Sequence, residues 1–377
     1  MILIAGAGIG GLTLAGALRQ AGLACTVFER AEVLKPLGAG ITVQINAMLA
    51  LRELGLAEAV AREGSPLSAL EVLHPSGRTL SHLPLAEVAR ESGQPALGIR
   101  RSRLQEVLLG ALAPGQVRTG VAVTDFQDDG QQVTVVLSDG TRVTGDVLVG
   151  ADGLRSAVRQ KLWPDALRYP GYTSWRGITK ELPRSAPDVA TETWGAGARF
   201  GIVPIGHGEL YWYATHNAPT GVQDEPGQAR ARLSALFGAW HAPILPLLES
   251  TPEAQLLRTD IHDRRPLRRW SQGRVTLLGD AAHPMTPNMG QGGCQAIEDA
   301  VVLARCLART GTSAEALADY ERRRLPRANA IVTRSFQLGR VAQWENATAR
   351  LLRDTALRLT PRAANLRQLR TLMRFET

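Results

Sequence analysis

The sequence predicts an α/β protein in which an N-terminal βαβ unit is combined with a second, mostly β region. Three observations lead to this class. The first thirty residues have the pattern of a strand, a glycine-rich turn, a helix and a second strand. Eleven of the 18 aromatic residues lie between Trp163 and Trp240, where strand-like segments such as "RFGIVPI" and "ELYWYAT" alternate. The segment "GRVTLLGDAA" then returns to a buried strand, and helical patterns continue to the C-terminus.

The first element is the apolar run "MILIAG", which has the length and composition of a buried strand. It lacks a basic n-region and runs directly into glycines, so it is not expected to be a signal peptide. The segment "GLTLAGALRQAG" places small and apolar residues at helical spacing and ends at Gly22. A second strand, "ACTVFER", completes the βαβ unit.

The turn of this unit carries the pattern G-x-G-x-x-G at Gly6, Gly8 and Gly11. Glycines at this spacing permit a tight turn, a close approach of the backbone to a pyrophosphate, and close packing of helix on strand. The helix N-terminus then presents unpaired N–H groups to the phosphates. Glu29 follows the second strand, where an acid accepts hydrogen bonds from a ribose. The motif predicts a dinucleotide site but does not separate NAD from FAD.

The middle of the sequence predicts helices over 46–62 and 102–113, followed by alternating strands from 117 to 152. These strands are expected to form an antiparallel meander that ends in a buried strand. A second motif, "GADGLRSAVR", begins there, with Asp152 and Gly153 before a helix that starts near Ser156. An aspartate at such a junction is compatible with a capped turn and equally with a ligand site.

The third motif is "GDAAHPMTPNMGQGG", which follows a buried strand and precedes a helix from about Cys294 to Arg309. Its glycines let the flat edge of a ligand approach backbone N–H groups. His283 has no acid or serine at a spacing that indicates a catalytic pair, so we expect a structural histidine. Cys294 begins the helix, where a thiolate would be stabilised, but it has no evident base and is expected to pack in the core.

Composition limits the classes of partner. The chain has 377 residues and a formal net charge of +8, but its arginines are scattered and no basic run is interleaved with aromatics. We therefore expect no nucleic-acid partner, while the positive charge favours anionic cofactors or substrates. No apolar run is long enough for a transmembrane segment. Three widely spaced cysteines predict neither disulfides nor a metal site and fit a cytoplasmic location; these are Cys25, Cys294 and Cys306.

Together, the three motifs resemble in order and spacing those of the single-component (group A) FAD-dependent aromatic hydroxylases and monooxygenases, which have the para-hydroxybenzoate hydroxylase fold. The resemblance extends over residues 1–330. "GYTSWRG", "RFGIVPI" and "GQGGCQAIEDAVVLA" are most similar to the branch of bacterial urate hydroxylases, zeaxanthin epoxidase and salicylate or hydroxybenzoate hydroxylases.

The resemblance implies a Rossmann-like FAD-binding domain of the GR2 type, an interleaved β-sheet substrate domain and a C-terminal helix. The FAD-binding domain is expected to comprise 1–68, 100–162 and 268–330, and the substrate domain 69–99 and 163–267. The remaining 331–377 are a basic amphipathic helical segment, expected to pack on the domain with its arginines facing water. A role at a membrane surface is the alternative for this segment.

The resemblance also implies roles for individual residues in binding FAD. Asp280 would bind the ribityl chain, and Asp152 with Gly153 would serve both FAD and the nicotinamide pyrophosphate. The ADP half would be bound by Gly6, Gly8, Ile9, Gly10, Gly11, Glu29 and Arg30, with Arg101 and the Val123 backbone contacting the cofactor. The flavin ring would lie beside the loop 38–46, which includes Gly40, and its pyrimidine edge beside Pro287, Gly290, Gly292 and Gly293.

Enzymes of this kind use NADPH or NADH to reduce FAD, and O2 then forms a flavin C4a-hydroperoxide that hydroxylates an electron-rich substrate. The resemblance therefore implies a monooxygenase acting on a small aromatic or other electron-rich molecule, in a monomer or homodimer. Arg199 and Tyr211 match substrate contacts in urate hydroxylase-like members, and a surface arginine with a core tyrosine is the alternative. A flavin reductase or cyclase acting on an isoprenoid lipid, and a ligand-sequestering flavoprotein, remain alternative functions.

Overall fold

The structure, a computed structural model, describes residues 1–34, 39–180 and 187–375, so residue 38 of the predicted flavin loop lies outside the described residues. A five-stranded parallel sheet with the order β18-β12-β1-β2-β8 forms the first layer. The run "MILIAG" forms its fully buried central strand, as predicted. The five strands are β1 (Ile2–Ala5), β2 (Cys25–Phe28), β8 (Val117–Arg118), β12 (Val147–Gly150) and β18 (Val275–Leu277).

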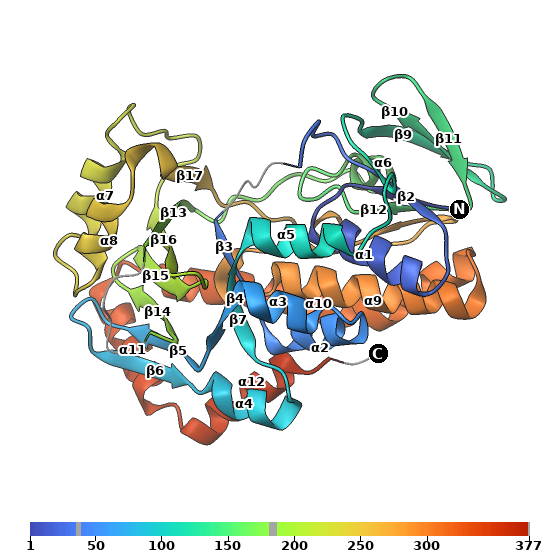
Figure 1. The fold of residues 1–377 in the computed structure, drawn as a ribbon. Coiled ribbons are helices and arrows are strands. Elements are labelled where there is room, and N and C mark those ends of the chain that lie inside the picture. The colour runs from blue at the N-terminus through green and yellow to red at the C-terminus, as the bar shows by residue number, and fades with distance from the viewer. Residues whose placement is uncertain (35–38, 181–186, 376–377) are drawn as a thin grey trace.

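Helices pack beside this sheet, with α1 against both α5 and α9 (Figure 1). The predicted helix over 46–62 is two helices, because Gly55 takes the left-handed conformation (φ +70°) that ends the first. The helix predicted over 102–113 is confirmed as α5. The helices of this region are α1 (Ile9–Gln20), α2 (Ile45–Glu53), α3 (Ala57–Glu63), α5 (Arg101–Gly110), α6 (Ala157–Leu162), α9 (Gly292–Thr310) and α10 (Ala314–Ala342).

The predicted meander is confirmed as a three-stranded antiparallel sheet of order β11-β10-β9. Its inward-facing residues alternate with partly exposed ones, as in Val133, Val135 and Leu137. Its strands are β9 (Val123–Asp128), β10 (Val133–Leu137) and β11 (Arg142–Gly145). The chain then enters β12 of the parallel sheet, which brings the second motif to the carboxyl end of that strand.

A seven-stranded mixed sheet of order β17-β13-β16-β15-β14-β5-β6 forms the second large layer. One face carries Trp175, Phe200 and Trp212, which pack against α7 (Ala229–Phe237) and α8 (Ile244–Ser250). The opposite face carries Tyr211 and Tyr213, because successive side chains of a strand point to opposite faces. The strands are β5 (Ala69–Leu73), β6 (Thr79–Leu83), β13 (Tyr172–Lys180), β14 (Val189–Trp194), β15 (Ala198–Pro204), β16 (Glu209–Asn217) and β17 (Leu257–Asp260).

A small antiparallel sheet of order β3-β7-β4 lies between the two large sheets (Figure 1). Its strands are β3 (Gly40–Val43), β4 (Gly64–Leu67) and β7 (Ala96–Arg100). A Cβ on Gly98 would lie 2.1 Å from the Pro204 carbonyl oxygen, so β7 and β15 meet backbone to backbone. The division into FAD-binding and substrate domains stays a prediction, and this sheet contains strands from both.

The chain after residue 330 is not one amphipathic helix. It contains the end of α10, then α11 (Ala347–Leu359) and α12 (Arg362–Met373), with Pro361 between the last two. Helix α12 packs beside α4 (Leu85–Ser92). In α11 the expected orientation is wrong at Arg353, which is buried, whereas Arg358 faces water as expected. None of the helices in the described ranges combines the length and the apolar composition needed to cross a bilayer.

Candidate functional site

The turn between β1 and α1 is built from glycines that serve two different purposes. Gly6 has φ +101°, and a Cβ there would lie 2.5 Å from the Ala151 carbonyl oxygen. A Cβ on Gly11 would lie 2.0 Å from the Gly6 carbonyl oxygen, so both positions require glycine for packing. A Cβ on Gly8, in contrast, would meet nothing within 4 Å. Gly8 also begins α1 without a side-chain cap, which leaves the first N–H groups of the helix for a ligand.

Glu29 is held firmly at the carboxyl end of β2, beside this turn. Its two carboxylate oxygens accept hydrogen bonds from the backbone N–H groups of Ala7 (2.8 Å) and Ala31 (2.9 Å). The Glu29 carbonyl accepts from the N–H of Val121, which brings the start of β9 and Val123 to the same place. Arg30 points outward and is exposed.

Asp152 acts as a helix cap and also leaves one oxygen available to a ligand, the two roles that its sequence position allows. One carboxylate oxygen caps α6 by accepting from the N–H of Ala157 (2.7 Å) and Val158 (3.4 Å). The other oxygen is buried and has no hydrogen-bond partner among the described residues. Burial accordingly raises the pKa of this carboxyl, against the hydrogen bonds that lower it. A buried acceptor without a partner is what a ligand donor would satisfy.

Asp280 lies in a single 3-10 turn, Gly279–Ala281, after β18. Its carboxylate is exposed and has no hydrogen-bond partner in the described part of the chain. A Cβ on Gly292 would lie 3.7 Å from the Asp280 Oδ1, so the carboxylate stands beside the N-terminus of α9. That helix also begins without a side-chain cap. Its first N–H groups and Asp280 therefore offer donors and an acceptor to one ligand.

The loop before α9 is fixed by the strand β3. Gly290 has φ +61°, and Gln44 donates to the Met289 carbonyl at 2.9 Å. A Cβ on Gly293 would lie 2.8 Å from the Ile41 side chain and 3.6 Å from the Ile9 side chain. The N-termini of α1 and α9 thus lie next to each other and next to β3. Two uncapped positive helix ends in one place favour an anionic ligand that spans both.

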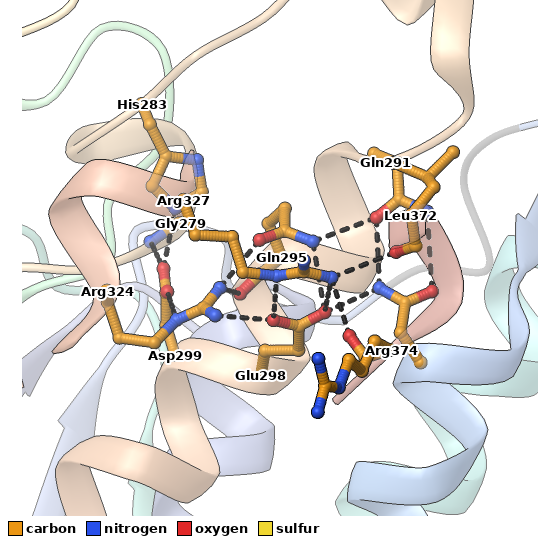
Figure 2. A network of polar contacts seen from close by, with 11 residues as sticks. Gly279, His283, Gln291, Gln295, Glu298, Asp299, Arg324, Arg327, Leu372 and Arg374 are labelled. Atoms are coloured by element: carbon orange, nitrogen blue, oxygen red, sulfur yellow. Dashed lines mark hydrogen bonds and ion pairs between the residues drawn. The ribbon is translucent and has the colours of Figure 1, made fainter. Parts of the chain in front are cut away.

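A buried polar network that joins α9 and α10 supports this loop (Figure 2). Asp299 accepts from the N–H of Gly279 (3.1 Å), from His283 Nε2 (2.6 Å) and from Arg324 Nε (2.7 Å). Arg324 also forms an ion pair with Glu298, and all three charged side chains are almost fully buried. Through Asp299, the network holds the turn that carries Asp280.

His283 is structural in this geometry. Its Nε2 is bound to Asp299, its ring packs 5.3 Å from Trp270, and it is 1% exposed. Burial alone raises the pKa of Asp299, but the charges of His283 and Arg324 outweigh it and lower that pKa to about 2. Cys294 is equally inert, because burial raises the pKa of its thiol to about 12.

The predicted substrate residues Arg199 and Tyr211 lie on the same face of the seven-stranded sheet, four residues apart along its strands. In the β15–β16 register, Arg199 pairs with Thr215, Gly201 with Tyr213, and Val203 with Tyr211. A Cβ on Gly40 would lie 2.5 Å from the Tyr211 side chain, so the predicted flavin loop touches the predicted substrate residue. This contact joins the two halves of the site.

Arg199 is 1% exposed, so the alternative of a surface arginine is wrong. It forms an ion pair with Glu192 (3.0 Å) and donates to Gln343 (2.9 Å) and Asn288 (2.7 Å). These bonds use one donor from each of its three nitrogens and neutralise its charge. Arg199 here connects the sheet to the loop before α9, and direct contact with a substrate stays a prediction.

Asn288 is the central residue of this connection, and the sequence did not reveal it. It accepts from Arg199, shares hydrogen bonds with the Tyr172 hydroxyl, and donates to the Ser335 carbonyl at 2.9 Å. Burial raises the pKa of Tyr172, so this hydroxyl stays protonated. The only available signal was the position of Asn288 between the predicted Pro287 and Gly290.

The other predicted contacts lie around this centre. Arg101 begins α5 and is exposed, and its N–H donates to the Ala39 carbonyl (3.2 Å), which places it beside Gly40. Pro287 is exposed at the first position of the turn Pro287–Met289. Gly10 is buried, and a Cβ there would lie 2.5 Å from Leu278 and 3.3 Å from Ala296 of α9. The structure thus gives Gly10 a packing role.

Comparison with known proteins finds matches over nearly the whole chain. The family model described as FAD binding domain matches residues 1–335. The aurachin C monooxygenase/isomerase of Stigmatella aurantiaca is 51% identical over 95% of this chain and 94% of its own length. The 2-heptyl-3-hydroxy-4(1H)-quinolone synthase of Pseudomonas aeruginosa is 38% identical over 97% of this chain and 96% of its own length. The crystal structure of Klebsiella pneumoniae HpxO complexed with FAD and uric acid aligns with a TM-score of 0.92 and 32% sequence identity. The alignment covers 99% of this chain and 96% of that chain.

Proposed function

Because this chain belongs to the FAD binding domain family and is an FAD-dependent monooxygenase, we propose that it uses NADH or NADPH to transfer one oxygen atom of O2 to a small, carbonyl-bearing aromatic heterocycle. The contact between Gly40 and Tyr211 carries the proposal. It places a predicted flavin-contacting strand directly against the sheet whose face holds the predicted substrate residues. Two of the relatives support the ring type, since one is named for a 4(1H)-quinolone and the other is complexed with uric acid.

Bound FAD supplies hydride acceptance and oxygen activation, which protein side chains do not provide. We assign its ADP half to Glu29, to the open space at Gly8 and to the N-terminus of α1, and its ribityl chain to Asp280. The residues fit the group, because the backbone donors, the unpartnered Asp152 oxygen and the exposed Asp280 carboxylate match phosphates and hydroxyls.

The N-terminus of α9 is assigned to the flavin edge on which negative charge develops. This helix has 19 residues, starts without a side-chain cap, and is rigidly positioned by buried charges. N–H groups that are fixed before the reaction stabilise developing charge without reorganisation. The glycines Gly292 and Gly293 leave the backbone accessible there.

The substrate is assigned to the face of the sheet that carries Arg199 and Tyr211. Glu192 already compensates the charge of Arg199, so this arginine does not select an anion. Arg199 positions Asn288 and the loop before α9, so its guanidinium is not available to a substrate carboxylate. This favours carbonyl-bearing heterocycles over simple aromatic carboxylates as substrates.

The test begins with the visible spectrum of the purified protein and continues with NADH and NADPH oxidation in the presence of a 4(1H)-quinolone, uric acid or salicylate. We expect a yellow protein in which a heterocycle accelerates oxidation and in which mass spectrometry finds one 18O atom from 18O2 in the product. Rapid oxidation of NAD(P)H that yields only hydrogen peroxide with every ring would reject the proposed substrate class. Tight ligand binding without accelerated oxidation would instead identify a ligand-sequestering flavoprotein.

A further inference from the structure

Helix α11 packs Leu357 inward but exposes its other leucines and buries a charged pair. Leu351, Leu352 and Leu359 are 67%, 65% and 74% exposed, whereas Arg353 and Asp354 are buried. A surface helix normally turns its leucines to the core and its charges to water. The exposed leucines, called the leucine face below, therefore have a role other than packing within the chain.

Buried polar contacts fix this orientation. Arg353 donates to the Ala342 carbonyl (3.0 Å) and to Asp354 (2.8 Å), and its guanidinium lies 5.4 Å from the centre of the Trp194 ring. Rolling α11 to bury its leucines would break all three contacts and bring a charged pair to the surface. The leucine face is thus held outward by the fold.

The leucine face is continuous and free of charge. At 3.6 residues per turn, Leu351, Leu352, Leu359, Thr348 and Thr355 fall within roughly 100° of the helix circumference. Four of the seven large hydrophobic side chains that are exposed in the described ranges belong to Trp344 and these leucines. Single exposed apolar residues need no explanation, but a cluster of this kind marks an interaction site.

The C-terminal end of the leucine face is bordered by arginines, whereas the exposed Glu345 precedes its N-terminal end. Arg358 and Arg362 are exposed at the end of α11 and the start of α12, while the one acid of α11, Asp354, is buried beside Arg353. Arg362 remains largely exposed although it pairs with Glu87. The whole chain has a formal charge of +8. An apolar strip with a basic border fits a partner that is apolar inside and anionic at its surface.

We propose that the leucine face docks α11 onto the surface of an anionic lipid bilayer. The helix has 13 residues, or about 20 Å, so it lies along the interface without spanning the bilayer. A second copy of the chain fits less well, because a two-fold contact through this face would bring two arginine-bordered strips together. This inference goes beyond the proposed function and does not depend on it.

Docking here would bring the seven-stranded sheet, to which the proposed function assigns the substrate, next to the membrane. Helix α11 packs on β6 at one edge of that sheet (Figure 1). Beneath Arg353, the indole of Trp194 donates to Glu192 (2.8 Å), which is the ion-pair partner of Arg199. A bilayer-bound enzyme would therefore hold its substrate face close to a source of lipid-soluble rings.

The experiment is vesicle flotation of the full-length, FAD-bound protein. Vesicles of phosphatidylcholine alone are compared with vesicles that also contain phosphatidylglycerol, at low and at high salt. We expect binding to the anionic vesicles that weakens with salt. The triple variant Leu351→Ser, Leu352→Ser, Leu359→Ser should bind them at least about tenfold more weakly. Leu257→Ser, at another exposed leucine on β17, is the matched control and should bind like the parent protein.

Further measurements separate the alternatives. Arg358→Gln with Arg362→Gln should abolish the preference for anionic vesicles, whereas Arg142→Gln, an exposed arginine on β11, should not. Absence of vesicle binding by the parent protein would overturn the proposal, as would equal binding by the triple variant. A dimer in light scattering that the triple variant converts to a monomer, without vesicle binding, would assign the leucine face to a second copy. Thermal unfolding and FAD absorbance establish that each variant is folded.

Discussion

Three glycines on one helix should respond in three different ways when a side chain is added. Gly8 caps the N-terminus of α1, and Gly11 and Gly16 lie within the helix. A Cβ would meet nothing within 4 Å at Gly8, the Gly6 carbonyl oxygen at 2.0 Å at Gly11, and only Leu112 and Ala111 near 3.9 and 4.0 Å at Gly16. These environments give each substitution a predicted sign.

The magnitudes follow from these distances. Gly16→Ala adds an ordinary contact and removes the backbone entropy of a helical glycine, so the free energy of unfolding should rise by about 0.5–1 kcal/mol. Gly11→Ala forces two backbone segments apart and should cost about 3 kcal/mol or more. Gly8→Ser fits the extended N-cap conformation (φ −73°, ψ −177°), so the apoprotein should keep its stability or gain a few tenths of a kcal/mol.

The Kd for FAD should distinguish the substitution at Gly8 from the substitution at Gly16. Serine at Gly8 occupies the open space next to the helix N–H groups and should remove about one charge-assisted hydrogen bond to the pyrophosphate. That corresponds to about 1.5–3 kcal/mol, or a rise in Kd of roughly 10- to 100-fold. Gly16→Ala should leave the Kd unchanged.

The assay is urea unfolding of apoprotein and FAD-reconstituted protein, together with FAD titration followed by flavin fluorescence. FAD should raise the free energy of unfolding of Gly8→Ser by less than that of the parent protein. The difference should equal RT times the logarithm of the ratio of the two Kd values. The reasoning is refuted if Gly8→Ser binds FAD like the parent protein, or if Gly16→Ala weakens FAD equally. The first result would move the pyrophosphate away from α1, and the second would show that any added side chain disturbs the helix.

Three further predictions concern the third motif and its support. Arg324→Met should lower the free energy of unfolding by about 3–5 kcal/mol in chemical denaturation, since it leaves two buried carboxylates without this partner. Arg323→Met, which removes a half-exposed ion pair on the same helix, should lower it by less than about 1 kcal/mol. Asp280→Asn should raise the Kd for FAD in a fluorescence titration without lowering the apoprotein melting temperature, because the carboxylate has no partner in the described chain. The Cys294 thiol, with a pKa of about 12, should stay protonated at pH 8 and react with a disulfide reagent only after unfolding; reaction in the native protein with a midpoint below pH 9 would contradict this.

The parts of the fold that the sequence predicted are those specified by local patterns. The strand at 2–5 follows from an uninterrupted apolar run, and the meander follows from alternation with turns at "DDGQ" and "SDG". The start of α9 follows from the glycines before it. Each of these signals lies within about twenty residues, a range over which periodicity and turn chemistry act directly.

The parts that the sequence did not predict depend on contacts between distant residues. Asn46 donates to Glu298, which is 252 positions away, and Arg199 reaches Gln343 across 144 positions. No local pattern specifies these partners, because they arise only when α2 packs on α9 and when β15 meets the end of α10. The same reason explains the error in α11, where burial of Arg353 against Trp194 overrides the expectation that arginines face water.

The third motif looks like a catalytic loop because it contains His283, Asp280 and glycines, but the structure separates these residues by burial. His283 and the buried acids face inward and hold backbone, whereas Asp280 and the N–H groups of α9 face the open side. Two sets of hydrogen bonds fix this segment. Asp299, which is bound to Arg324, accepts from the N–H of Gly279, and Asn288 accepts from Arg199. The charged side chains in both sets are paired within the protein. This segment therefore offers a ligand its fixed backbone and the Asp280 carboxylate. Such a surface suits a site whose chemistry resides in the bound flavin, because the protein then has to contribute position and fixed dipoles rather than a reactive side chain.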